Sequence, residues 1–367
     1  MKKKTKIFLA AVLVFLLVAG GVTWSFLPHP LNYRINAVQS VGSDLTVVDE
    51  GADSVTVRKE GTDEYKVMIF TDMHLDGKNK TSKTTVSHLV ENILREKPDL
   101  VLLGGDNVTS ALNGVRCRQL GKIFEKLGVY WAGVIGNHEG DNPGSVRRDK
   151  MMDIFTSFNH CLMKRGRDDV TGDCNYALHL LDANGNHVQT FYFFDTFDMV
   201  ADEDKAQYGY EVTDKVTDGV KPDQVQWYTE TLAADKQTWE GMSSVVLMHI
   251  PLPQVKEAQE KGDFLMGGTL EGVCCSGFDT GLFDAIKAGG STKAVFCGHD
   301  HMNNFAAVYD GIRLSYIEPS GYGSYNTGNK LGYEEKDWLQ GYTKLILHAD
   351  GSFDQTQVRN SAVAESE

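Results

Sequence analysis

The sequence predicts an α/β fold whose β-sheet is covered by helices on both faces. Several short runs are apolar without alternation, such as residues 100–103 and 245–248, and unbroken runs of this kind are typical of strands buried on both sides. Segments with apolar residues three and four positions apart lie between these runs and predict amphipathic helices. With 367 residues, of which 41% are hydrophobic, the chain is long enough to bury a large core.

The predicted elements alternate along the chain. The helix over residues 84–96 is predicted from apolar residues at helical spacing, and Pro98 ends it. Gly128 closes a second helix and Pro222 opens a third. The predicted strands are residues 54–58, 66–71, 100–103, 129–135, 189–194, 244–248 and 293–297, and the predicted helices are residues 84–96, 116–127 and 222–232.

The N-terminus predicts export. Four lysines precede an uncharged run over residues 7–27, and a run of this length can cross a bilayer as a helix. No charge follows before Arg34, so the lysines should stay in the cytoplasm. Residues 1–28 are therefore expected to be a signal-anchor that leaves the body outside the cell membrane; the alternative is a cleaved signal peptide and a secreted body.

The rest of the chain divides into three further parts. Residues 29–65 are expected to be a linker with a first strand, residues 66–350 one large domain, and residues 351–367 a C-terminal tail. The whole chain has a formal charge of −14, and setting aside the four N-terminal lysines leaves −18 on residues 31–367. A body this acidic excludes general nucleic-acid binding, which depends on Lys and Arg neutralising phosphates.

The chain has six cysteines, and an even number in an exported chain permits disulfides. Cys161 and Cys174 flank a polar loop and form the best candidate pair; the alternative is that all six are reduced and buried. No C-x-x-C spacing occurs, which argues against a zinc site made of thiolates.

Five of the predicted strands are followed by clusters of residues that bind metals. These are Asp72-Met73-His74, Gly104-Gly105-Asp106-Asn107, Gly136-Asn137-His138-Glu139, His249, and Gly298-His299-Asp300-His301. Ligands bind beyond the carboxyl ends of strands in open α/β sheets, so the five clusters are expected to meet in one crevice.

Aspartate, histidine and amide ligands without thiolate suit Mn, Fe or Zn. Asp72 and His74 are two residues apart, so an extended backbone would point both side chains the same way, and the same rule applies to His299 and His301. Asp106 has two carboxylate oxygens and could bridge two ions. Two divalent ions about 3.5–4 Å apart would clamp the attacking and leaving oxygens of an in-line displacement.

The ordered motifs D-x-H, G-D, G-N-H-E, H and G-H-x-H resemble the calcineurin-like metallophosphoesterase superfamily over about residues 66–350. The resemblance implies a four-layered α/β/β/α sandwich with a dinuclear metal centre. The residue roles that it implies are Asp72, His74 and His301 on one metal, Asn137, His249 and His299 on the other, Asp106 as the bridge, and His138 as the group that protonates the leaving group.

A closer likeness is to the purple-acid-phosphatase-like branch. It is carried by GVCC at residues 272–275, GHDHMNNF at 298–305 and GYG at 321–323. Two positions depart from that branch: Thr109 stands where its members have a tyrosine iron ligand, and Asn304 where an aspartate is usual. The first departure implies a centre without tyrosinate–iron colour.

Together these features predict an exported phosphoesterase that uses a hydroxide bridging two divalent ions. A small phosphomonoester is the favoured substrate; the alternatives are a phosphodiester and a non-catalytic metal-binding scaffold. Tyr322 and Tyr325, in a glycine-rich loop, are candidates for the substrate entrance. Asp300 is expected to point away from the metals, and Asp195 and Asp198 to have structural roles, whereas Glu139 could support the site or lie in solvent.

Overall fold

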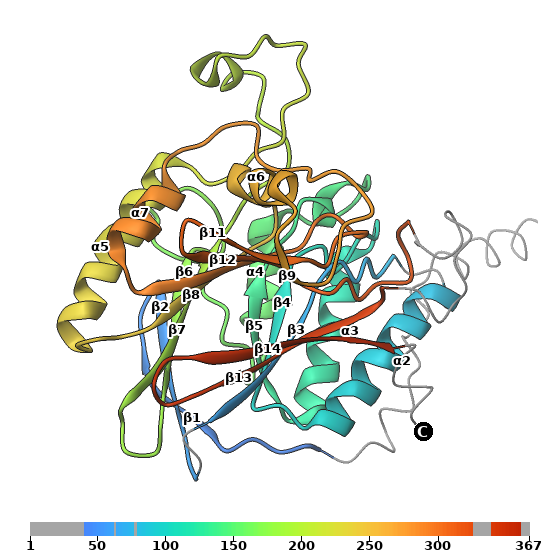
Figure 1. The fold of residues 1–367 in the computed structure, drawn as a ribbon. Coiled ribbons are helices and arrows are strands. Elements are labelled where there is room, and N and C mark those ends of the chain that lie inside the picture. The colour runs from blue at the N-terminus through green and yellow to red at the C-terminus, as the bar shows by residue number, and fades with distance from the viewer. Residues whose placement is uncertain (1–39, 62–63, 77–78, 326–338, 361–367) are drawn as a thin grey trace, which may run out of the picture.

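In the computed structural model, residues 40–61, 64–76, 79–325 and 339–360 are described. They form two mixed β-sheets with helices on the outer faces (Figure 1). The larger sheet contains, in spatial order, β1 (Leu45–Glu50), β2 (Ser54–Lys59), β6 (Tyr176–Leu181), β7 (His187–Phe194), β8 (Ser244–Met248), β10 (Thr292–Cys297), β12 (Ile312–Tyr316), β11 (Ala306–Tyr309) and β9 (Phe264–Met266). The smaller contains β14 (Phe353–Arg359), β13 (Gly341–Leu347), β3 (Tyr65–Phe70), β4 (Leu100–Gly104) and β5 (Tyr130–Val134).

The helices cover the two outer faces. α5 and α7 lie on one outer side in Figure 1, α2 and α3 lie on the other, and the sheets run between them. The helices are α2 (Asn79–Glu96), α3 (Asn113–Leu127), α4 (Arg148–Phe155), α5 (Pro222–Thr238), α6 (Pro253–Lys261) and α7 (Leu282–Gly289), with short 3₁₀ turns η2 (His138–Gly140) and η3 (Lys205–Tyr208).

The apolar residues divide into two cores because successive strand residues point to opposite faces. In β8, Val245 and Leu247 belong to the core shared with the smaller sheet, α2 and α3. Val246 and Met248, from the same strand, pack into a second core with α5, α6 and α7. The larger sheet is thus buried on both sides, which explains the unbroken apolar runs in the sequence.

The strand register brings the metal-ligand residue types to one edge. In the smaller sheet β3, β4 and β5 are parallel, with Phe70 opposite Leu103 and Leu103 opposite Gly133. In the larger sheet the parallel strands β8 and β10 place Leu247 opposite Phe296. The loops that follow these five strands carry the five motifs.

Three expectations need revision or fall outside the description. Residues 353–359, expected in a C-terminal tail, form β14, which pairs with β13 along its whole length. All six cysteines are free, so the expected Cys161–Cys174 disulfide is not formed, and Cys174 is instead buried in the core. No helix within the described ranges is both long and apolar enough to cross a membrane; the predicted segment at residues 7–27 lies outside those ranges, as does the end of the tail.

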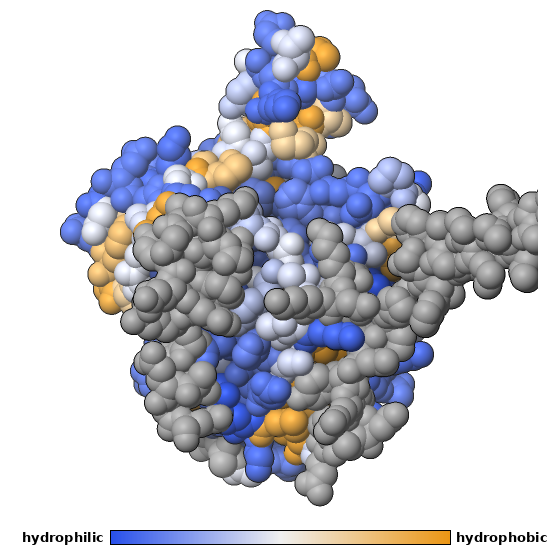
Figure 2. Space-filling model, turned by 90° about the vertical axis from the view of Figure 1, so that its right-hand side faces the viewer, coloured by the Kyte–Doolittle hydropathy of each residue, from blue (hydrophilic) through white to orange (hydrophobic). Residues whose placement is uncertain are grey.

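One segment projects from the body next to the motif edge. It leaves at Asp198 and returns at Asp218, and backbone hydrogen bonds join the two sides at its base. Figure 1 shows this segment rising above the sheets, and Figure 2 shows that its tip is largely hydrophilic.

Candidate metal centre

A first group of buried side chains meets beyond β3, β4 and β10. Asp72, His74, Asp106 and His301 each offer one ligand atom, and these atoms lie within 4.8 Å of one another. His74 Nε2 is 3.1 Å from His301 Nε2 and 3.4 Å from Asp106 Oδ2. His301 Nε2 is 3.3 Å from Asp72 Oδ1. This group has the donors and the spacing to hold one metal ion.

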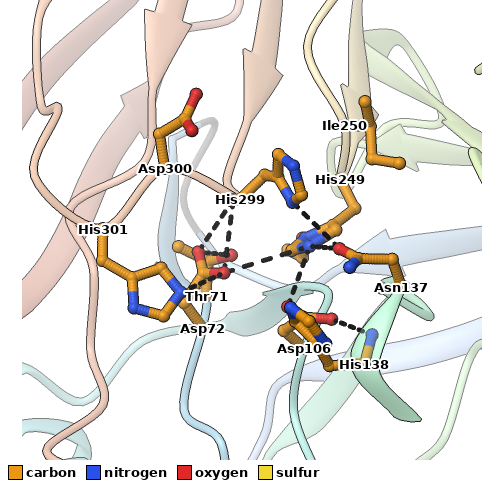
Figure 3. A network of polar contacts seen from close by, with 12 residues as sticks. Thr71, Asp72, Asp106, Asn137, His138, His249, Ile250, His299, Asp300 and His301 are labelled. Atoms are coloured by element: carbon orange, nitrogen blue, oxygen red, sulfur yellow. Dashed lines mark hydrogen bonds and ion pairs between the residues drawn. The ribbon is translucent and has the colours of Figure 1, made fainter. Parts of the chain in front are cut away.

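A second group shares Asp106 with the first. Asp106, His249 and His299 also offer ligand atoms within 4.8 Å of one another. Asn137 joins them, because its Oδ1 is 3.0 Å from His249 Nε2 and 2.9 Å from His299 Nδ1 (Figure 3). Asp106 Oδ2 is 3.2 Å from His249 Nε2. The two groups are therefore adjacent and have one carboxylate in common.

The backbone at these residues is not extended. Asp72, His74, Asp106 and His299 have φ values of 54°, 43°, 49° and 79°, in the left-handed region that non-glycine residues rarely adopt. The two-residue spacing rule was therefore the wrong reason for Asp72 and His74 to converge, and it also failed for His299 and His301, which enter different groups. Such backbone outliers cluster at functional sites because the surrounding structure must hold them in place.

Two glycines beside the ligands allow close approach, as expected. A Cβ on Gly105 would lie 2.5 Å from His249 Nδ1, and one on Gly136 would lie 2.2 Å from the Asp106 backbone nitrogen. Gly105 also has a φ of 97°. A side chain at either position would displace a predicted ligand.

The arrangement of donors fits a cation. His249 Nδ1 lies 2.8 Å from the backbone oxygen of Gly104 and can donate to it, which leaves Nε2 facing Asp106. Asp106 Oδ2 is buried and has no hydrogen-bond partner among the described residues. Buried carboxylates at this spacing need positive charge close by, which a protonated imidazole or a metal ion can supply.

Burial and the neighbouring carboxylates also shift the pKa values of the histidines in the two groups. Burial opposes a charge on His249, but Asp106 and Asp72 outweigh it and raise the pKa of His249. Burial lowers the pKa of His74 to about 4 and of His299 to about 3, although the carboxylates oppose it. These two histidines are therefore neutral near pH 7, which is the form that binds metals.

His138 lies beside the two groups and not within them. Its backbone N–H donates to Asp106 Oδ1 over 2.8 Å, and its ring centroid is 5.5 Å from that of His74. Its side chain is 43% exposed, whereas the ligand-type side chains are buried or, in the case of His299, partly buried, and its Nδ1 contacts the carboxylate of Asp141. Burial disfavours the imidazolium, but Asp106 and Asp141 overcome this and raise the pKa of His138.

The two tyrosines named from the sequence lie in different surroundings. The Tyr325 ring stacks on His301, with centroids 4.3 Å apart and planes 6° apart. Its hydroxyl accepts a bond from the His301 backbone N–H and donates to Glu271 Oε1 over 2.8 Å. Tyr322 instead stacks on His88 of α2. Tyr325 thus contacts a predicted ligand; that either residue contacts substrate stays a prediction.

The structure also shows the contacts of three acidic residues near the metal-ligand groups. Glu139 is buried under the centre, and its Oε1 accepts a 2.7 Å bond from the Asn107 backbone N–H. Asp300 points away from the cluster in Figure 3 and accepts a 2.9 Å bond from the Cys274 N–H. Asp195 pairs with Arg148. These contacts answer the open question for Glu139 and agree with the expected orientation of Asp300.

Sequence reasoning missed two residues that contact the site. Glu271 supports Tyr325, and Asp141 contacts His138. Asp141 lies two residues after the G-N-H-E motif, so its position in the sequence could have identified it as a neighbour of His138. Glu271 carries no such local signal.

The chain belongs to the calcineurin-like phosphoesterase family, whose model matches residues 65–303. It is a metallophosphoesterase with a buried Asp/His cluster that can bind metal. The match begins at β3 and ends just after His301, so it includes all five motifs.

Similar proteins include a probable inactive purple acid phosphatase 14 of Arabidopsis thaliana, which is 27% identical over 77% of this chain and 76% of its own length. The phosphatase DCR2 of Saccharomyces cerevisiae is 25% identical over 70% of this chain and 47% of its own length. Among solved structures, a dimetal phosphatase from Danio rerio matches 80% of this chain and 99% of its own, at 14% identity and a TM-score of 0.49.

Proposed function

We propose that this protein is an active phosphoesterase with two divalent metal ions, and that it hydrolyses a small phosphomonoester. The observation that carries the proposal is the shared Asp106, whose unpartnered Oδ2 lies 3.4 Å from a nitrogen of one histidine group and 3.2 Å from a nitrogen of the other. A single carboxylate placed between two donor groups fits a bridging ligand better than an ordinary buried aspartate, which would have hydrogen-bond donors around it.

The residues divide into two ligand sets. Asp72, His74 and His301 would hold one ion, Asn137, His249 and His299 the other, and Asp106 both. The oxygen and imidazole donors suit Mn, Fe or Zn. When bound, such ions activate water and neutralise phosphate oxygens during in-line displacement at phosphorus.

His138 would act on the leaving group. Because Nδ1 faces Asp141, the other ring nitrogen, Nε2, is the one available to a bound ester. A proton on Nε2 could pass to the ester oxygen as its bond to phosphorus breaks, so that an alcohol leaves in place of an alkoxide. Asp141 would keep the ring oriented and favour the protonated form.

The charge of the body does not oppose an anionic substrate. Asp72 and Asp106 are the only formally charged side chains in the two ligand sets, and together they carry −2. Two divalent ions would make the cluster locally positive. A phosphate ester would thus be attracted by the positive charge of the metal centre and not by a broad basic surface.

The preference for a monoester is supported by the relative that is named as a phosphatase. The word "inactive" in the name of the Arabidopsis relative sets the opposite expectation, and the full ligand set of this chain supports activity. We also propose that the catalytic part lies outside the cytoplasm, anchored through residues 7–27; cleavage of that segment and secretion is the alternative.

The test is an assay of the metal-loaded full chain on an aryl phosphate and on a bis-aryl phosphate, with metal analysis of the same samples. Hydrolysis of the monoester that is lost in Asp106→Asn, and kept in the matched control Asp263→Asn at an exposed site, would support the proposal. Faster hydrolysis of the diester would reassign the substrate class. Bound metal without hydrolysis of either ester would identify a non-catalytic scaffold.

A further inference from the structure

A second pocket lies at the opposite ends of the strands from the metal centre. It has a volume of about 740 Å³ and is lined by Lys236, Ser243, Ser291, Lys293, Arg313 and the turn between β13 and β14, together with several glycines. Ser243 and Ser291 directly precede β8 and β10, so the pocket is at the amino ends of the parallel strands whose carboxyl ends carry His249 and His299. Nothing in the proposed phosphoesterase mechanism uses this pocket.

The lining is positively charged on an acidic protein. Three cations, Lys236, Lys293 and Arg313, line the pocket, with Asp350 as the one acidic lining residue. None of the three cations forms an ion pair with any of the described residues. The Asp350 carboxylate already accepts bonds from the backbone N–H and the hydroxyl of Ser352. A chain of formal charge −14 thus concentrates unpaired positive charge at one place.

Most hydrogen-bond donors of these cations have no acceptor among the described residues. Lys236 Nζ donates to the backbone oxygen of Gly289 over 2.8 Å, and Lys293 Nζ donates to that of Gly290 over 2.9 Å. Each ammonium has three N–H donors and uses one, so capping the end of α7 does not satisfy either group. Arg313 has five donors and makes one long bond of 3.4 Å, to Gln355.

The pocket also has a rigid wall and an unsatisfied hydroxyl. The Arg313 guanidinium lies over the Phe353 ring, 4.9 Å from its centroid, which holds the cation in place. Ser243 is 6% exposed, and its Oγ has no hydrogen-bond partner among the described residues. Buried hydroxyls normally have a partner, so this one indicates a group that is supplied from outside the chain.

We infer that this pocket binds the phosphate group of a small soluble molecule, at a site separate from the metal centre. Lysine and arginine donors around one concave surface, with a serine hydroxyl and glycine backbone nearby, match the three or four acceptor oxygens of a phosphate. The volume exceeds that of inorganic phosphate and leaves room for an organic part.

The experiment counts the phosphate bound by the full, metal-loaded chain in equilibrium dialysis against labelled inorganic phosphate at fixed ionic strength. The wild type should bind two phosphates, one at the metals and one in the pocket. Lys236→Gln/Lys293→Gln keeps an amide donor for the glycine carbonyls but removes both charges. It should bind about 100-fold more weakly, or not at all, at the second site, because it loses two charge-assisted bonds to the phosphate.

Two further variants make the result specific. Ser243→Ala should weaken the second site without changing the thermal midpoint by more than a small amount, and Lys256→Gln, an exposed lysine on α6 outside the pocket, should change nothing. If the proposed function fails and the metal centre binds no phosphate, the wild type should still bind one phosphate in the pocket, and the double variant should bind none. This result differs from failure of the inference about the pocket. Equal binding by wild type and double variant would overturn the inference, as would charge-dependent binding to phosphatidylserine vesicles without binding of free phosphate.

Discussion

The two halves of the metal centre are held in different ways. His249, in the second half, is fully buried, and its Nδ1 is fixed by the main-chain oxygen of Gly104. His301, in the first half, is fixed by side chains, because Tyr325 stacks on its ring and Glu271 holds the Tyr325 hydroxyl. Main-chain support cannot be removed by substitution, whereas side-chain support can. The affinities for the two ions should therefore be separable by mutation.

The largest effect is expected where the halves meet. Asp106→Asn should lower hydrolysis by about 10³-fold or more and weaken both ions, because the amide loses a negative charge and places N–H donors where lone pairs converge. In the metal-free protein the same change should lower the free energy of unfolding, because it removes the ion pair between Asp106 and His249. Hydrolysis rates, metal content and thermal denaturation in a chelator check the three outcomes. Full metal occupancy with wild-type activity would show that Asp106 does not join the halves.

A change beside both halves should separate catalysis from metal binding. His138→Ala should retain the metals and lose about 10²- to 10⁴-fold in turnover of esters with poor leaving groups, because it removes the proton donor. Esters with activated leaving groups should be affected much less. Metal analysis together with rates on both kinds of ester provides the measurement; loss of metal along with both activities would assign His138 to ligand support.

A smaller effect should be confined to the first half. Tyr325→Phe keeps the ring on His301 but removes the hydroxyl bonds to Glu271 and to the His301 backbone, so one ion should bind about 10- to 100-fold more weakly, the usual range for residues that orient ligands. Competition with a metal-binding dye resolves the two affinities. Equal weakening of both ions would mean that the halves are not independent.

The smallest effect on the centre is expected from Glu318, at the start of the loop that packs on Asp72. Burial raises the pKa of Glu318 from 4.5 to about 7, against a bond from Asn304 and the charge of Arg359. A raised carboxyl pKa gives stability that is full below pH 4.5 and is lost as the pH rises through about 7. Glu318→Gln is neutral at every pH, so it should be more stable than the wild type above pH 7, by up to about 3 kcal/mol, and similar to it below pH 4.5.

Urea denaturation of both proteins at the two ends of this pH interval gives the comparison. Metal content should not differ between them. A variant that is less stable than the wild type at the alkaline end would contradict the protonation argument for Glu318.

The sequence predicted the centre better than its surroundings. Each ligand-type residue follows a strand that is mostly apolar, so a local pattern was sufficient to find Asp72, Asp106 and His249. The left-handed backbone of Asp72 and His74 could not be predicted, because nothing in a non-glycine residue type signals it. Glu271 was missed for a different reason: it meets Tyr325 only through the fold.

Two of the missed strands have a physical explanation. β14 alternates polar residues on a half-exposed edge of the smaller sheet, and its sequence, FDQTQVR, has little apolar content. β9 has three residues, too few for a period to be detected. β8 is buried at every position and was predicted with its observed bounds, since four of its five residues are apolar. β6, with the sequence YALHLL, is equally buried but was not predicted.

The central claim is that two ion-binding halves share one carboxylate, and the most direct measurement is the number of metal ions per chain in wild type, His249→Ala and His301→Ala. The account predicts two ions in the wild type and one in each variant, with the remaining ion bound by the intact half. A single ion in the wild type, or two ions retained in either variant, would contradict it.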